Sequence, residues 1–108
     1  MDETFIRNRI TALRLKKGVS EYKMSTDMGH SKSYIQSITS GRAMPSFSEF
    51  LYMCEYFGTT PRDFFDDEIQ NPALLQQVKD ALQILDDEDL TLILSIIKRF
   101  QHYDELLK

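Results

Sequence analysis

Apolar residues recur along this chain at intervals of three and four, which is the spacing of one face of an α-helix. The first such run contains Ile6, Ile10 and Leu13 and stops at Gly18, with basic residues just before the glycine. Such residues suit the carboxyl end of a helix. Signals for β-hairpins are absent from the sequence. The pattern therefore predicts an all-α protein.

Residues typical of helix ends divide the rest of the front half into short segments. Ser20 and Ser31 are expected to cap a second and a third helix, which Gly29 and Gly41 would end. A fourth helix is expected from Pro45-Ser46 to Gly58. The expected apolar stripe of this fourth helix is Phe47, Phe50, Leu51, Cys54 and Phe57. Thr60-Pro61 then opens one more helical turn.

The character of the sequence changes after Asn71-Pro72. Two further helices are expected, over residues 72–85 and 87–107, with Asp86 to Asp89 as the cap and acidic first turn of the last one. The apolar face of the last helix is wider than contact with one neighbouring surface would require. The two C-terminal helices are therefore a candidate interface.

Composition excludes several classes of protein. The chain has 108 residues, which suits one small domain with an appendage. One cysteine and two separated histidines exclude an internal disulfide and the usual zinc clusters, and they fit a reducing cytoplasm. No export signal, membrane span, catalytic triad or Gly-rich phosphate loop is evident. We therefore expect a cytoplasmic protein that is not an enzyme and carries no metal or cofactor.

The charge is divided unevenly along the chain. Residues 1–45 hold eight Lys and Arg against four Asp and Glu, a net charge of +4. Residues 46–108 hold five basic against 13 acidic residues, a net charge of −8. A basic front and an acidic rear would orient the protein toward a polyanion.

Residues 20–41 meet the requirements of a helix-turn-helix. A Gly-tolerant turn lies at Gly29, and the small residue Ser25 suits the point where the two helices cross. Met28 and Ile35 can close the interior. The expected outward face of the second helix is polar and consists of Lys32, Ser33, Gln36 and Ser37.

Several stretches in order resemble the Cro/C1-type helix-turn-helix family of bacterial and phage repressors, also called the XRE family. The resemblance covers about residues 5–66 and implies a five-helix lambda-repressor-like DNA-binding domain, expected over 1–68. The helical pair expected from apolar spacing, over 69–108, lies outside the resemblance. The stretches are Ile10-x-x-Leu13-Arg14, Gly18-Val19-Ser20, Met28-Gly29-His30-Ser31-Lys32-Ser33-Tyr34-Ile35, Ile38-x-x-Gly41-Arg42, Pro45-Ser46 and Thr60-Pro61-Arg62-Asp63-Phe64-Phe65.

Carried over position by position, the resemblance makes residues 31–40 the recognition helix. Base contacts are then expected from Lys32, Ser33 and Ser37, with Gln36 as a further candidate. Phosphate contacts are expected from Ser20, Ser40 and Arg42.

Three residues depart from the pattern of the family. Glu21 stands where the family often has Gln near the DNA backbone, and an anion there should repel phosphate. Thr39 stands where an acidic partner of Arg14 is common, which leaves Arg14 free or bonded elsewhere. Ser25 replaces the more usual Ala.

The predicted function is a sequence-specific transcriptional regulator, a repressor, that binds double-stranded DNA as a homodimer. The expected dimer interface is Ile93, Leu94, Ile97 and Phe100 in the last helix, and the alternative is that the helical pair folds back on residues 1–66. The alternative function is a protein-interaction module whose C-terminal helices bind a regulatory partner, such as an antirepressor or a toxin.

Overall fold

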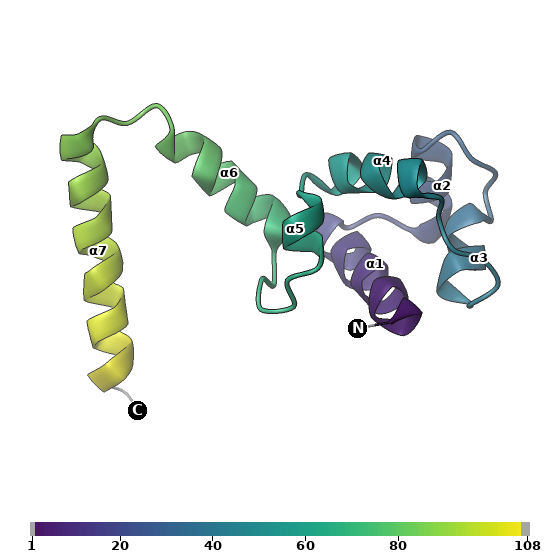
Figure 1. The fold of residues 1–108 in the computed structure, drawn as a ribbon, viewed down its shortest axis with the longest axis horizontal. Coiled ribbons are helices and arrows are strands. Elements are labelled where there is room, and N and C mark those ends of the chain that lie inside the picture. The colour runs from purple at the N-terminus through teal and green to yellow at the C-terminus, as the bar shows by residue number, and fades with distance from the viewer. Residues whose placement is uncertain (1, 107–108) are drawn as a thin grey trace. The chain divides into compact units, whose positions relative to one another are not determined.

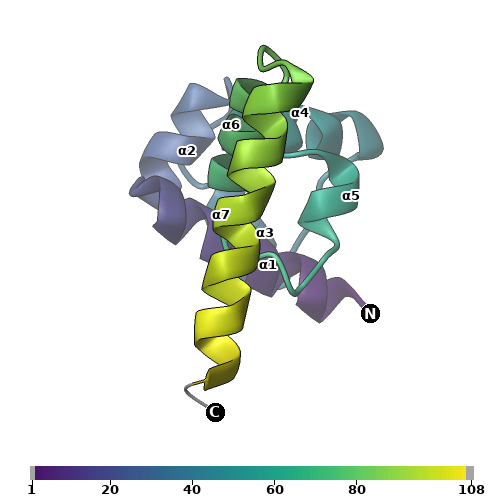
Figure 2. The ribbon, with the colours of Figure 1, turned by 90° about the vertical axis from the view of Figure 1, so that its left-hand side faces the viewer.

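The computed structural model describes residues 2–106, with side chains up to residue 102 (Figure 1). Over these residues the chain forms seven helices and no strand, which confirms the predicted all-α class. The last helix is the longest, with 20 residues, and is unbroken (Figure 2). The helices are α1 (Glu3–Lys17), α2 (Glu21–Asp27), α3 (Tyr34–Thr39), α4 (Phe47–Phe57), α5 (Pro61–Phe64), α6 (Pro72–Leu82) and α7 (Asp87–Leu106).

Several of these helices begin or end at predicted cap residues, whereas α6 ends at Leu82, three residues before its predicted end at residue 85. The side chains of Ser20, Ser46 and Thr60 each accept a hydrogen bond from the backbone N–H three residues further on, at 3.0, 3.2 and 3.1 Å. Gly18 and Gly58 follow the last residues of α1 and α4, as predicted. These contacts satisfy backbone groups at helix ends that would otherwise lack partners.

The third helix begins later than its predicted cap at Ser31. The N–H of Tyr34 donates to the carbonyl of Ser31 at 3.1 Å, which closes a tight turn over residues 31–33. Ser33 takes the N-cap position of α3, and its side chain makes no capping hydrogen bond. Because the first bond spans three residues rather than four, Lys32 and Ser33 lie in the turn that leads into the helix.

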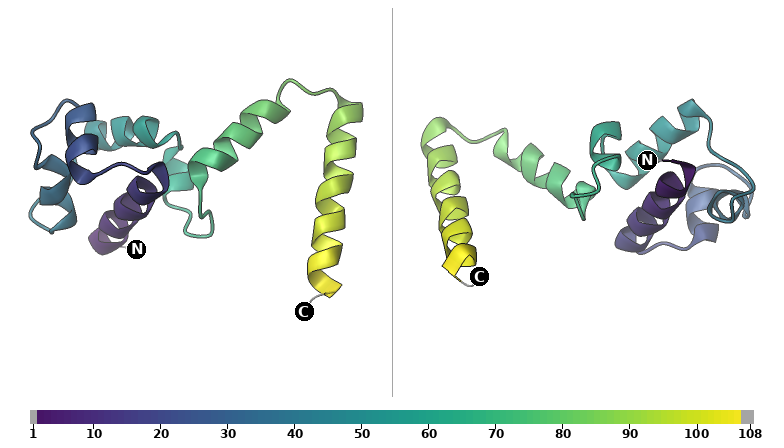
Figure 3. Two further views of the ribbon diagram at one scale, coloured as in Figure 1. Left: turned by 180° about the vertical axis from the view of Figure 1, so that it is seen from behind. Right: turned by 60° about the horizontal axis from the view of Figure 1, so that its bottom comes forward.

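The helices α1 to α5 gather around one apolar core (Figure 3). Contacts between α1 and α3, α1 and α4, α2 and α3, and α4 and α5 hold this unit together. Nearly all of the expected core positions on the first three helices are buried. The buried apolar residues are Ile10, Leu13, Met24, Met28, Ile35, Ile38, Met53, Cys54, Phe57 and Phe64.

The predicted apolar stripe of α4 is wrong at two positions. Phe47 is 77% exposed and Leu51 is 40% exposed, whereas Met53 is fully buried. The buried face of α4 runs through Met53, Cys54 and Phe57, whereas Phe47 is the first residue of the helix, six positions before Met53. Phe47 lines an apolar hollow of about 270 Å³ together with Ile6, Met44, Pro45, Ser46, Phe50 and Phe65.

Arg9 is a buried cation that links α1 to the end of α5, and no sequence pattern indicated this role. Its guanidinium donates to the carbonyls of Phe64 at 2.7 Å and Asp63 at 3.0 Å. It also donates to the carbonyls of Asp66 at 3.0 Å and Ile69 at 2.9 Å. Arg9 thus brings a charged donor to carbonyls at the carboxyl end of the short helix α5 and in the segment that follows it.

By internal contacts the chain divides into two compact units, Met1–Gln76 and Gln77–Lys108. The helix α7 opens with a cap in which Asp86 accepts from the N–H of Asp89 at 2.9 Å, as predicted. Its apolar side chains include Ile97 and Phe100, which are 45% and 68% exposed. Residue 107 of the expected last helix lies outside the described residues. The predicted domain boundary at residue 68 stays a prediction.

Candidate nucleic-acid interface

The helices α2 and α3 cross at Ser25, which is fully buried. Its hydroxyl donates to the carbonyl of Glu21 at 2.7 Å and accepts from the N–H of Ile35 at 3.0 Å. The N–H of Ile35 lies in the first turn of α3 and has no partner within that helix, so the side chain of Ser25 satisfies it. Ser25, which departs from the family pattern, therefore links the two helices through its hydroxyl.

The turn between the two helices is built on Gly29. This residue has a φ of +78°, a left-handed conformation that favours glycine. The N–H of Gly29 donates to the carbonyl of Thr26 and the N–H of His30 donates to that of Ser25, both at 3.0 Å. This pair of bonds is the Schellman motif, and it satisfies the last carbonyls of α2. The predicted turn position is confirmed.

The two faces of the α3 segment differ in character. Ile35 and Ile38 are fully buried, while the side chains of Lys32, Ser33 and Gln36 are exposed. The fourth predicted base-contact residue, Ser37, is half-buried, and its hydroxyl donates to the carbonyl of Tyr34 at 2.6 Å. Three of the four candidates for base contact are thus exposed.

The three candidates for phosphate contact are also exposed. Ser20 uses a lone pair of its hydroxyl to cap α2, which leaves its O–H available as a donor. The hydroxyl of Ser40 donates to the carbonyl of Ser37 at 3.3 Å. The guanidinium of Arg42 donates through Nη2 to Oε1 of Gln36. Arg42 and Gln36, which sequence reasoning treated separately, therefore lie in contact.

The two remaining departures from the family pattern are bonded within the domain. Oε2 of Glu21 accepts from the hydroxyl of Thr39 at 2.9 Å, which joins the start of α2 to the end of α3. Nη1 of Arg14 donates to the carbonyl of Val19 at 2.8 Å, and its Nε is buried without a hydrogen-bond partner. Of the two possibilities left open for Arg14, the structure therefore supports bonding elsewhere.

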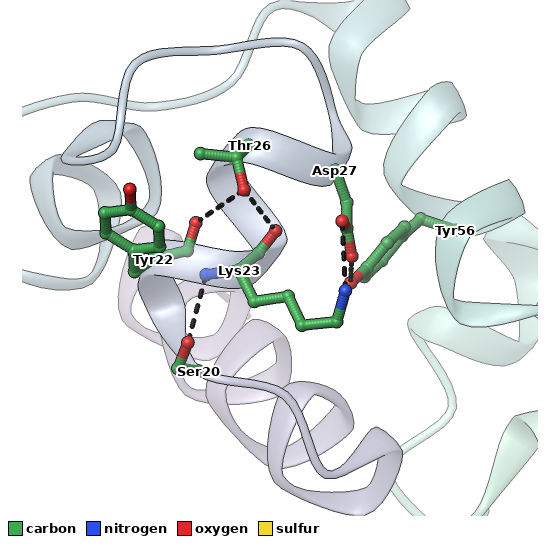
Figure 4. Close-up of polar contacts among 6 residues, drawn as sticks. All are labelled: Ser20, Tyr22, Lys23, Thr26, Asp27 and Tyr56. Carbon is green, nitrogen blue, oxygen red and sulfur yellow. Dashed lines mark hydrogen bonds and ion pairs between the residues drawn. The ribbon is translucent and has the colours of Figure 1, made fainter.

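Lys23, on the outer side of α2, is neutralised by a neighbouring acid. Its Nζ lies 3.2 Å from Oδ1 of Asp27, whose Oδ2 accepts from the hydroxyl of Tyr56 at 2.8 Å (Figure 4). The hydrogen bond from Tyr56 lowers the pKa of Asp27. Burial and the contact with Asp27 raise the pKa of Tyr56 to about 12. This cluster ties α2 to α4, and it adds no net positive charge to the surface.

His30 makes contacts that the sequence did not indicate. Its ring stacks on Tyr34 with the centroids 3.8 Å apart, and its Nε2 lies 2.9 Å from Oε2 of Glu49 in the first turn of α4. Burial, and then the charge of Glu49, raise the pKa of Tyr34. Because His30 and Glu49 are 19 residues apart, only the folded path of the chain brings them together.

Positive charge remains on the polar face of α3. Over the described residues no acidic side chain pairs with Lys32 or Arg42, and the partner of Arg42 is a neutral amide. A short helix crossed by a second one, with an accessible polar face and unpaired cations, is the arrangement of a DNA-binding helix-turn-helix.

A family model described as helix-turn-helix matches residues 10–64, just over half of the 108-residue chain. The chain belongs to the Cro/C1-type helix-turn-helix family, the XRE family, and is a DNA-binding transcriptional regulator of that type. This is a family of regulators and not typically of enzymes. No curated protein and no solved structure matched the chain. No helix in the described part is long and apolar enough to cross a membrane.

Proposed function

We propose that this regulator is a repressor that binds a pseudo-palindromic operator as a homodimer. The observation that carries the proposal is the exposed polar face at α3, held against α2 through Ser25. That face lies in the part of the chain with a net positive charge. Repression needs only that the bound protein covers a promoter, so no further domain is required for it.

In this proposal the base edges are read by Lys32, Ser33, Gln36 and Ser37. Lysine can donate to O6 and N7 of guanine, and glutamine can bond adenine through both ends of its amide. Serine donates or accepts with less discrimination. Because Ser37 already donates to its own helix, we assign it a weaker part than the exposed Lys32 and Gln36.

The phosphate contacts are assigned to Ser20, Ser40 and Arg42. Contacts of this kind set the position of the protein on the duplex and carry no sequence information of their own. Each phosphate neutralised by a lysine or arginine releases bound counterions, so binding should weaken steeply as salt rises.

A homodimer is proposed because a single short recognition helix covers only a few base pairs. Two such helices on half-sites about 34 Å apart would double the contacted sequence. The proposed interface is the apolar face of α7, formed by Ile93, Leu94, Ile97 and Phe100. Ile93 is half-buried, and Leu94, Ile97 and Phe100 are 49%, 45% and 68% exposed, a large apolar patch to leave in water.

The test is selection of bound duplexes from a random pool, followed by titration of the winner by fluorescence anisotropy. Lys32→Glu should abolish binding of the selected duplex, because it reverses a charge on the proposed face. Arg62→Glu, the same reversal on exposed Arg62 of α5, is the matched control and should retain most of the affinity.

Equal losses in the two variants would contradict the assignment of the face. No enrichment at all would favour the other function, a protein-interaction module. The exposed apolar face of α7 would then be the surface on which to seek a regulatory protein such as an antirepressor or a toxin.

A further inference from the structure

Two exposed side chains of the proposed interface are bonded to each other. Nη2 of Arg42 donates to Oε1 of Gln36, and the two residues are six positions apart. Gln36 lies on α3, whereas Arg42 lies in the loop that follows the helix. A residue proposed to contact phosphate therefore touches a residue proposed to contact a base.

The backbone after α3 brings the two side chains together. Gly41 has a φ of +90°, in the left-handed region that favours glycine. Its N–H donates to the carbonyl of Ile38, and the N–H groups of Arg42 and Ala43 both donate to the carbonyl of Ser37, all at 3.0 Å. This Schellman motif turns the chain back along α3. Arg42 is thus anchored beside the helix by its own backbone.

The chemistry of the two groups allows only one arrangement of the amide. A guanidinium has five N–H donors and no acceptor, so it can bond only the oxygen of a glutamine amide. Rotating the amide of Gln36 by half a turn would set its NH₂ group against the N–H groups of Arg42. Arg42 therefore selects one of the two orientations that a free glutamine can adopt.

The orientation of the amide determines which bases Gln36 can accept. A free glutamine can rotate to match either a donor or an acceptor on a base edge. A glutamine whose amide oxygen is held by a neighbouring donor presents its oxygen and its NH₂ group at fixed positions. A base that demands the opposite order then leaves polar groups unpaired at the interface, which costs affinity.

We propose that Arg42 is a positioning residue for sequence recognition, because it holds the Gln36 amide in one orientation at the base pair that Gln36 faces. This inference rests on the proposed operator binding. The other N–H groups of Arg42 stay available for a phosphate, so one side chain serves both roles. The bond strengthens when DNA covers the surface and excludes water.

The experiment measures Kd for the selected operator and for its single-base-pair variants at every position. Wild type is compared with Arg42→Ala, Gln36→Ala and the double variant. Arg42→Ala should weaken binding to all duplexes and also reduce discrimination at one base pair by about 5-fold to 10-fold. That base pair should be the one at which Gln36→Ala loses discrimination, and the double variant should lose no more there than Gln36→Ala alone.

The control is Arg62→Ala, which removes one exposed positive charge outside the proposed face. It should leave the ratios between duplexes as they are in wild type. Arg42→Ala acting in the same way, with uniform weakening and unchanged ratios, would overturn the inference while leaving operator binding intact.

Failure of the proposed function gives a different result. If wild type selects no operator, or if Lys32→Glu binds the operator as well as wild type does, the assigned face is wrong and this role of Arg42 is overturned with it. A urea midpoint of Arg42→Ala equal to that of wild type shows that the exposed side chain acts on recognition and not on folding.

Discussion

At the scale of single residues, Arg9 links α1 to the end of α5 although no sequence pattern indicates this role. It is 8% exposed, and its guanidinium donates to four backbone carbonyls after and within α5. A charge removed from water needs such a complete set of partners. Two of the acceptors are carbonyls at the end of the four-residue helix α5, and the other two lie in the segment that follows it.

Removal of the Arg9 side chain should therefore destabilise the domain strongly. We expect Arg9→Ala to lower the free energy of unfolding by about 3 kcal/mol, because buried carbonyls lose charged donors. Urea unfolding followed by circular dichroism measures this. Lys16→Ala, at an exposed cation on the same helix, should change it by less than about 0.5 kcal/mol. Similar midpoints for the two variants would disprove the role of Arg9.

Side-chain contacts between distant residues mark the limit of what the sequence can predict at this scale. The core positions Ile10, Leu13 and Ile35 follow from helical spacing, and they are buried as predicted. The bonds of Glu21 to Thr39 and of His30 to Glu49 join residues 18 and 19 positions apart. Such pairs depend on the path of the backbone, which local patterns of apolar and polar residues do not specify.

At the scale of helices, hydrogen bonds between residues close in sequence determine where several of the helices begin. Ser20, Ser46 and Thr60 act as caps because the hydroxyl and the N–H it meets are only three residues apart. The N-cap of α3 is Ser33, two residues after the predicted cap at Ser31. There the N–H of Tyr34 donates to the carbonyl of Ser31 and the N–H of Ile35 donates to the hydroxyl of Ser25, so a partner on another helix helps to shape the turn.

The contact between α2 and α4 in Figure 4 has a consequence at high pH. The hydroxyl of Tyr56 donates to Asp27 at 2.8 Å, and the ring of Tyr56 lies 4.7 Å from Nζ of Lys17. Burial and the bond to Asp27 raise the pKa of Tyr56 from 10.0 to about 12. Because the pKa of Tyr56 is higher in the folded state than in the unfolded state, its contribution to stability is complete below the unfolded-state pKa. That contribution is lost as the pH rises through the folded-state pKa.

We therefore expect the urea midpoint of wild type to fall between pH 10 and pH 12 more steeply than that of Tyr56→Phe. Ionisation of Tyr56 would place a second negative charge beside Asp27, and the phenylalanine variant has no group to ionise there. Tyr52→Phe, at an exposed tyrosine on α4, is the control and should follow the wild-type curve. Parallel curves for Tyr56→Phe and wild type would contradict this reading of the contact.

At the scale of the whole molecule, the two compact units have different surfaces. The first encloses its own apolar core and presents polar residues at α3. In the second, α7 carries Leu94, Ile97 and Phe100 with 49%, 45% and 68% of each residue exposed. A helix with this much apolar surface in water suits association with another helix. The proposed homodimer uses it for that purpose.

An acidic residue in the middle of this face should separate the subunits. We expect Ile97→Asp to convert a dimer to a monomer at micromolar concentration, with its helix content largely retained, since a charge would be buried without a partner. Sedimentation velocity and circular dichroism measure the two properties. Ser95→Asp, on the opposite side of α7, is the matched control and should stay dimeric. Wild type that sediments as a monomer would refute the dimer.

The most direct test of operator binding by the face at α3 is an NMR titration of the ¹⁵N-labelled 108-residue chain with the selected duplex. We expect the largest changes in amide chemical shift on residues 31–42 and around Ser20. Saturation should occur at one duplex for each two chains. Changes confined to α7, or binding that leaves residues 31–42 unshifted, would contradict the account.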